Sequence, residues 1–315
     1  TLSELILCNA DNSSISNITI IGSTTKNDGI FVSRVDNSNF TNINSSFRYY
    51  GFSFYASNYN TLTNITANSN TQGVYLSYVN NSILTNIRAG NNSLRGFWIS
   101  GNSYNNTLKD SFIKDNAQFG IYVQSSGVQY NLFYNNYFNN TVQYYNTTNT
   151  TNFFNISKTL GTNIVGGAYL GGNYWAAPNG SGFSQTCTSS TDGICDTAYS
   201  LDGLNYDYLP LTCTESWSCG AWGDCSGSTQ TRICTDANYC QTYKYQPITS
   251  QACTYTSGGG LPPNPSVTQT STISSISSGG SVSVSVQSPK IDIRNITLSA
   301  KNNITKISNK IIIIK

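Results

Sequence analysis

The sequence predicts an all-β fold: a parallel β-helix with coils of about 22 residues, then a small disulfide-rich module and a β-strand tail. Three observations predict this fold. Glycines recur every 22 to 24 residues, a short alternating apolar segment follows each of them, and cysteines crowd into the later part of the chain. Asn, Ser, Thr and Gly dominate the composition, and these residues disfavour helix interiors.

The repeat is clearest in apolar tetrapeptides that begin with glycine: Gly29–Val32, Gly51–Phe54, Gly73–Leu76, Gly96–Ile99 and Gly120–Val123. Their alternation has the period of a β-strand, so every second side chain should point inward. The expected inward set is Ile30, Val32, Phe52, Phe54, Val74, Leu76, Phe97, Ile99, Ile121 and Val123. Coils stacked at about 4.8 Å would bury these side chains in one continuous core.

A second segment follows at a fixed offset, at Phe40–Ile43, Leu62–Ile65 and Leu84–Ile87. It places Asn42, Asn64 and Asn86 in register. Asparagine tolerates the left-handed backbone of a corner, and stacked amides can hydrogen-bond to one another. We therefore expect an asparagine ladder. A sandwich of ordinary strands is the alternative, and the fixed spacing disfavours it.

Units of the form G-I-x-V-x-x-x-x-N-x-x-x-x-N-I resemble the repeats of the pectate-lyase-like superfamily, above all its NosD-like family. Gly171–Trp175, Asp192–Thr197 and Asp207–Leu211 resemble that family's closing segment. The resemblance implies a right-handed β-helix over residues 1–165 and a closing segment over 166–212, as in archaeal-type cell-surface proteins. The sequence departs from the family pattern at Cys195, where a glycine is usual.

Residues 213–256 form the predicted module, which is too small to fold without disulfides. Its cysteines are Cys213, Cys219, Cys225, Cys234, Cys240 and Cys253, and the sequence does not choose their pairing. The segment resembles a shortened thrombospondin type 1 repeat. That resemblance implies a stack of Trp217, Trp222 and Arg232 with a cation–π contact. The module is either a disulfide-bonded spacer or a ligand-binding domain that uses its tryptophan face.

Two further cysteines, Cys187 and Cys195, bracket a short loop and are expected to pair. Cys8 is the odd cysteine, beside Ser33 in the predicted register. It is expected to be unpaired or to bond to another chain, to the module or to a residue before the first position.

The last part of the chain divides into a Ser/Gly/Pro-rich linker over residues 257–280 and a tail over 281–315. Strands are predicted at 281–286, 291–298 and 304–314. The run Ile311–Ile314 is an aggregation hazard if it is exposed. The tail is either part of an incomplete β-domain or a donor of strands to a neighbouring subunit.

The composition excludes several functions. There is no histidine and no methionine, so Ser-His-Asp, Cys-His and His-zinc chemistry are excluded, and copper is disfavoured. A net charge of +2 gives no sign of the basic surface that binds nucleic acid. No apolar run is long enough to span a membrane.

Acidic residues are sparse in the predicted coils. The pairs Asp11/Asp36 and Asp110/Asp115 have the spacing of two carboxylates, but turn residues have it too, and we predict no catalytic residue. Asp192, Asp196, Asp202 and Asp207 form the densest acidic group. Calcium is the cation that such oxygen ligands suit, with loop capping as the alternative. No other cofactor is expected.

An outward line of aromatic residues is expected at Phe31, Tyr75, Trp98 and Tyr122. Aromatic side chains along one face suit sugar rings or a partner subunit, and packing between coils is the alternative.

Clustered cysteines and Asn-X-Ser/Thr sequons indicate an extracellular or cell-surface protein with covalent N-glycans. The sequons begin at Asn12, Asn17, Asn39, Asn44, Asn64, Asn80, Asn91, Asn105, Asn139, Asn146, Asn149, Asn155, Asn179, Asn295 and Asn303. The favoured function is a structural or adhesive subunit of a surface layer or filament that self-associates through the tail. A protein that binds or cleaves a polysaccharide is the alternative.

Overall fold

A computed structural model describes residues 3–22, 27–189, 192–213, 215–238, 240, 246–254, 303–307 and 310–314. They form two compact units. The first contains the described residues up to Ser216, together with Asp236–Asn238, Cys240 and the strands at 303–314. The second contains Trp217–Thr235 and residues 246–254.

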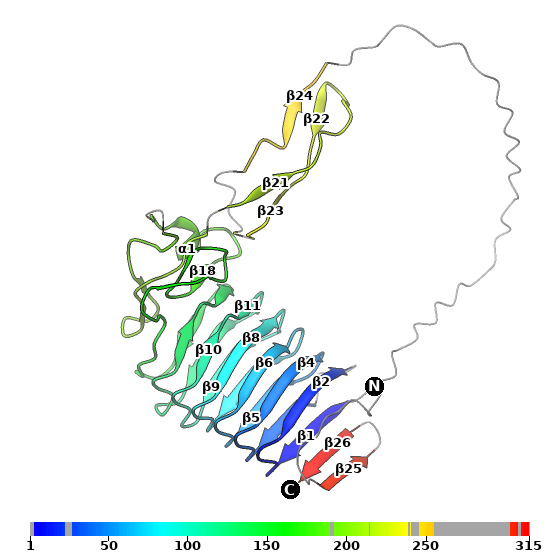
Figure 1. Cartoon of the computed structure of the whole chain (residues 1–315), viewed down its shortest axis with the longest axis vertical. Coiled ribbons are helices and arrows are strands. Elements are labelled where there is room, and N and C mark those ends of the chain that lie inside the picture. Colours follow the sequence, from blue (N-terminus) through cyan, green and yellow to red (C-terminus); the bar gives the residue numbers. More distant parts are fainter. Residues whose placement is uncertain are drawn as a thin grey trace, which may run out of the picture. The chain divides into compact units, whose positions relative to one another are not determined.

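The first unit is a parallel β-helix, in which strands from successive coils lie side by side (Figure 1). We call its first face sheet B. The coil strands of sheet B pair in parallel, each with its counterpart one coil further on. In spatial order they are β1 (Glu4–Cys8), β3 (Ile30–Ser33), β5 (Tyr50–Tyr55), β7 (Gln72–Ser77), β9 (Arg95–Ser100), β12 (Phe119–Gln124) and β15 (Tyr144–Asn146).

The other face, sheet A, is built from β2 (Ser14–Ile21), β4 (Asn39–Ser46), β6 (Thr61–Thr66), β8 (Ile83–Gly90), β11 (Phe112–Lys114), β14 (Tyr137–Asn139) and β18 (Tyr174–Ala176). Its strands also pair in parallel. The two halves of β8 pair with different strands, β10 (Thr107–Lys109) and β11. Asp110 separates these strands with a φ of 53°, and β13 (Leu132–Tyr134) continues the β10 side. The coil therefore bends at a left-handed residue.

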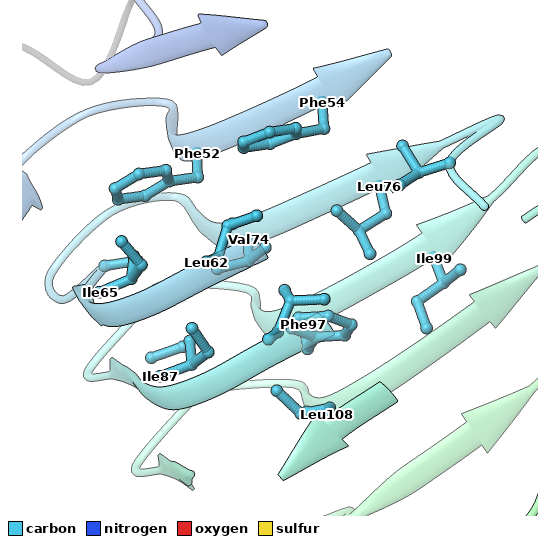
Figure 2. Packing of buried hydrophobic residues seen from close by; sticks show 14 of the residues in the cluster. Phe52, Phe54, Leu62, Ile65, Val74, Leu76, Ile87, Phe97, Ile99 and Leu108 are labelled. Carbon is cyan, nitrogen blue, oxygen red and sulfur yellow. The ribbon is translucent and has the colours of Figure 1, made fainter. Parts of the chain in front are cut away.

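The core lies between the two sheets and confirms the expected inward set. Ile30, Val32 and their counterparts as far as Val123 are at most 1% exposed. Figure 2 shows Phe52 and Phe54 beside Val74 and Leu76 of the next coil. Phe40 of sheet A packs edge-on against Phe54 of sheet B, with ring centroids 5.1 Å apart. One continuous apolar column thus holds the coils together.

The expected asparagine ladder is also present, and Asn17 extends it by one coil. The Nδ2 group of each asparagine donates to the Oδ1 atom of its predecessor, at 3.2 Å from Asn42, 2.9 Å from Asn64 and 2.7 Å from Asn86. Their φ angles lie between 53° and 56°. Asparagine occupies these corners because it adopts left-handed backbone at low cost.

Three further ladders are buried and were not predicted from the sequence. In each, a side-chain oxygen accepts a hydrogen bond from the backbone N–H of the previous ladder position, at 2.7–3.1 Å. That position lies in the preceding coil except at the end of the second ladder, where Gln143 accepts from Asn140 three residues earlier. The acceptors of the first are Ser38, Asn60, Ser82, Asn106, Asn131, Asn152 and Asn205. Those of the second are Asn70, Asn92, Asn116, Asn140 and Gln143. Those of the third are Ser111, Asn136, Asn173 and Asp207.

The second buried ladder explains why glycine recurs. A Cβ atom placed on Gly51 would lie 2.7 Å from the Nδ2 atom of Asn70, and one on Gly96 would lie 2.5 Å from that of Asn116. Gly73 and Gly120 meet Asn92 and Asn140 in the same way. The glycine and the buried amide therefore form one packing unit, repeated from Gly51 to Gly120, whereas Gly29 faces Ser45 instead.

After the coils come short elements that close the stack: β16 (Thr159–Leu160), β17 (Tyr169–Leu170), α1 (Phe183–Thr186), β19 (Tyr199–Ser200) and β20 (Tyr206–Asp207). Strands β16 and β17 pair antiparallel, as do β19 and β20. The disulfide Cys187–Cys195 is formed as predicted. Trp175 packs under this segment, stacked on Phe138 with ring centroids 4.6 Å apart.

The second unit holds β21 (Trp217–Cys219), β22 (Thr229–Thr231), most of β23 (Cys234–Asp236) and β24 (Ser250–Ala252). Strands β22 and β24 are antiparallel. Two disulfides, Cys219–Cys234 and Cys225–Cys253, belong to this unit. The third disulfide, Cys213–Cys240, joins residues of the β-helix unit. The predicted module over residues 213–256 is therefore shared between the two units.

The tail departs from the predicted single strand over 304–314. It forms β25 (Asn303–Ile307) and β26 (Lys310–Ile314), which pair antiparallel. Strand β26 then pairs in parallel with β1. The predicted linker and the predicted strands at 281–286 and 291–298 lie outside the described residues.

Candidate functional site

The acidic residues of the coils take part in the turns. The Oδ1 atom of Asp11 accepts the backbone N–H of Asp36 at 2.8 Å, and Asp36 in turn accepts that of Asn58 at 2.6 Å. The carboxylate of Asp110 lies 3.7 Å from the Nζ atom of Lys109 and accepts a hydrogen bond from the Nδ2 group of Asn135. Each of these three carboxylates therefore binds a neighbouring donor in its own coil or the next.

Asp115 behaves similarly, with its carboxylate 3.2 Å from the Nζ atom of Lys114. Both groups are well exposed, so the pair contributes little to stability. Asp110 and Asp115 lie at two different corners of one coil, directly after β10 and β11, and both have positive φ angles.

The four carboxylates proposed for calcium lie in different surroundings. Asp192 lies 2.6 Å from the Nζ atom of Lys158. Asp196 is exposed. Asp202 accepts hydrogen bonds from Asn146 and Asn205. Within the described ranges, the structure gathers no group of three or more Asp, Glu, Cys or His side chains that could hold a metal ion.

Asp207 is completely buried and ends the third ladder. It accepts hydrogen bonds from the backbone N–H groups of Asn173 and Leu209, at 2.7 and 3.0 Å, and from the indole N–H of Trp175 at 2.8 Å. Burial raises its pKa to about 7, and these donors only partly offset the increase. Through these hydrogen bonds, Asp207 connects the closing segment to the last coil.

Charged residues also lie at the amino-terminal end of the stack. Glu4 and Arg48 are both more than nine-tenths buried. The pKa of Asp28 is raised to about 6, mainly by burial and secondarily by the nearby charge of Glu4. Burial lowers the pKa of Arg48, against the influence of Glu4. This end of the β-helix therefore carries a small buried group of opposite charges.

Three of the four outward aromatic residues, Tyr75, Trp98 and Tyr122, form a continuous column on sheet B. Tyr75 and Trp98 have ring centroids 4.4 Å apart, and Trp98 and Tyr122 have centroids 5.9 Å apart. Tyr50 stacks on Tyr75 at 5.1 Å. Phe31 lies at the same register position but is separated from Tyr75 by Ser53.

Two members at the far end of the column, Phe119 and Tyr145, were not predicted from the sequence. They stack at 4.6 Å with an interplanar angle of 7°. The guanidinium of Arg95 lies between Trp98 and Tyr122, 4.7 and 4.3 Å from their ring centroids. Rings along the column therefore contact one another or Arg95, as packing between coils produces, while Tyr145 at the far end stays 46% exposed.

A cavity of about 510 Å³ lies at the carboxyl-terminal end of the coils. Trp175, Phe183 and Tyr199 contribute aromatic walls, and Gln143 contributes an amide. That amide is already bonded, since its Nε2 group donates to the backbone oxygen of Ala176 at 2.6 Å. Polar atoms make up most of the remaining lining, and the short helix α1 contributes Phe183 and Thr186 to it.

In the second unit, the Arg232 guanidinium lies 4.5 Å from the ring centroid of Trp222, so the expected cation–π contact is present. Arg232 also donates from Nε to the backbone oxygen of Ile248 at 2.9 Å. Trp217 lies in β21 and is partly exposed. The contact links two segments within this disulfide-bonded unit.

Cys8 lies in β1, with Ser33 as its register partner in β3. It is the free cysteine of the described residues.

The fold and these surroundings define a disulfide-bonded parallel β-helix protein. Residues 3–180, more than half of the chain, match the family described as NosD, periplasmic copper-binding protein. The chain belongs to the NosD family. No curated protein and no solved structure gives a significant match. The family's periplasmic description and the four disulfides are consistent with a secreted protein. Among the described residues, no helix is long and apolar enough to cross a membrane.

The family description names copper, but the donor groups of this chain do not fit that metal. Copper sites in proteins use imidazole, thiolate and thioether ligands. The sequence has no histidine and no methionine. Eight of the nine cysteines are in disulfides, which leaves the single thiol of Cys8.

Proposed function

We propose that the chain is a glycosylated structural or adhesive protein of the cell surface and a subunit of a layer or filament. The observation that carries this proposal is the use of polar side chains between coils. Asp11 and Asp36, the acids with the spacing of a catalytic pair, accept backbone N–H groups of the next coil. Such residues stiffen a scaffold, and the tail supplies strands for contacts between subunits.

The sequons agree with an exposed scaffold because most of them lie on sheet A and the corners. None lies within β3, β5, β7, β9 or β12 of sheet B, and Asn146 at the end of β15 is the one sequon in the coil strands of that sheet. Asn139 is an exception to the glycosylation pattern, since it is buried and leaves no room for a glycan. Asn295 lies outside the described residues, and Asn303 begins β25.

The test is electron microscopy of cell-surface material labelled with an antibody to this chain, with intact-mass measurement for glycans. Ordered polymers containing the chain are the expected result. Isolated single particles without a lattice would overturn the proposal. Binding to surface polysaccharides would then be assayed, with the double variant Trp98→Ser/Tyr122→Ser to remove the centre of the aromatic column.

A further inference from the structure

The tail lies on the first strand of sheet B. Strand β26 pairs with β1 along its whole length, from Glu4 opposite Lys310 to Cys8 opposite Ile314. On its other side, β1 pairs with β3 in the same parallel sense. Strand β26 therefore occupies the position that a preceding coil would take, and it covers the hydrogen-bonding edge that β1 would otherwise expose.

The covering strand comes from a distant part of the chain. About 50 residues separate the last described position of the second unit, Thr254, from Asn303. Fully extended, a segment of that length spans at most about 160 Å. The covalent connection therefore allows the pair β25–β26 to reach an edge other than its own.

A second copy offers the same edge with the same residues. The contacts made by β26 on β1 are identical whether the two strands belong to one chain or to two. The choice is then set by concentration, since the covalent connection holds the tail near its own edge at an effective concentration on the order of 1 mM. The surface layer proposed above would raise the concentration of neighbouring copies in the same way.

We propose that β1 of one copy binds the strand pair β25–β26 of a second copy, in the register seen within the chain. Reciprocal exchange gives dimers, and one-way exchange gives open chains of subunits. This inference rests on the proposed function for the crowding that favours exchange. The exchange itself is a property of the purified chain.

The register supplies the experiment, because position 314 lies opposite Cys8. The wild-type chain is mixed with the double variant Cys8→Ser/Ile314→Cys. A disulfide between Cys8 and position 314 in this mixture joins two chains by construction. It is detected on non-reducing gels and assigned by peptide mass. The matched control is Cys8→Ser/Thr305→Cys, since Thr305 lies in β25 and pairs with β26 rather than β1.

The expected result is a cross-link through position 314 that increases with total protein and reaches half of its maximum near 1 mM. The control should give at most a tenth of this yield. A cross-link absent up to that concentration would overturn the proposal. So would failure of the single variant Ile314→Cys to close its internal disulfide, because the register would then be wrong. Neither result depends on where the protein resides, so the surface role is tested separately.

Discussion

Removing one buried ladder amide should destabilise the β-helix far more than removing an exposed one. The chosen change is Asn116→Ala, at the centre of the second buried ladder. The side-chain oxygen of Asn116 accepts hydrogen bonds from the backbone N–H of Asn92 at 3.1 Å and from its Nδ2 group at 2.8 Å. Its own Nδ2 group donates to the backbone oxygen of Ala89 at 3.0 Å.

The substitution removes four hydrogen bonds. Two donors of Asn92 and one acceptor of Ala89 lose their partner, whereas Oδ1 of Asn140 loses the Nδ2 group of Asn116 but keeps that residue's backbone N–H. Each such group costs about 1–3 kcal/mol when its hydrogen bond is lost. Water entering the vacated space recovers part of this free energy. We therefore expect the free energy of unfolding to fall by about 3–6 kcal/mol.

The matched control is Asn64→Gly in the exposed ladder. Asn64 also bonds to amides of both neighbouring coils, but its groups reach water. Its φ of 56° suits glycine, so the backbone is not strained. The expected loss is below about 1 kcal/mol.

Equilibrium unfolding in urea, followed by far-UV circular dichroism, measures both variants. A loss for Asn116→Ala no larger than that for Asn64→Gly would refute the reasoning, because buried and exposed ladders would then contribute equally.

Three other outcomes are expected. Gly96→Ala should lower the free energy of unfolding, measured by thermal unfolding, by about 1–3 kcal/mol. The loss should be smaller in an Asn116→Ala background, where the opposing amide is gone, and equal losses in both backgrounds would show that Gly96 and Asn116 do not pack as a unit. The pKa of Asp207, raised from 3.8 to about 7, means that the folded state holds a proton that the unfolded state releases, so the melting temperature should fall as pH rises through that window. A melting profile of the same slope in Asp207→Asn would exclude Asp207 as the cause. Replacing Cys187 and Cys195 by serine should lower stability by about 2–3 kcal/mol, and a wild-type chain insensitive to reductant would count against this disulfide contribution.

Local sequence patterns were sufficient to predict the β-helix. Residues such as Phe52 and Val74 lie 22 positions apart because each coil brings the chain back to the same place, so spacing and alternation predict both the strands and the core. The exposed ladder through Asn42 and Asn64 followed from the same register. The disulfide Cys187–Cys195 followed from proximity along the chain.

The tertiary structure decided which polar residues face inward. Asn64 and Asn70 are the same residue type in the same coil, yet one is exposed at a left-handed corner and the other is buried against Gly51. Composition and spacing do not separate them, because the difference depends on the direction of each corner. The pairing of β26 with β1 could not be predicted from local sequence patterns either, since it joins the two ends of the described chain. Short-range periodicity is encoded locally, whereas burial and strand exchange depend on which surfaces meet once the coils have stacked.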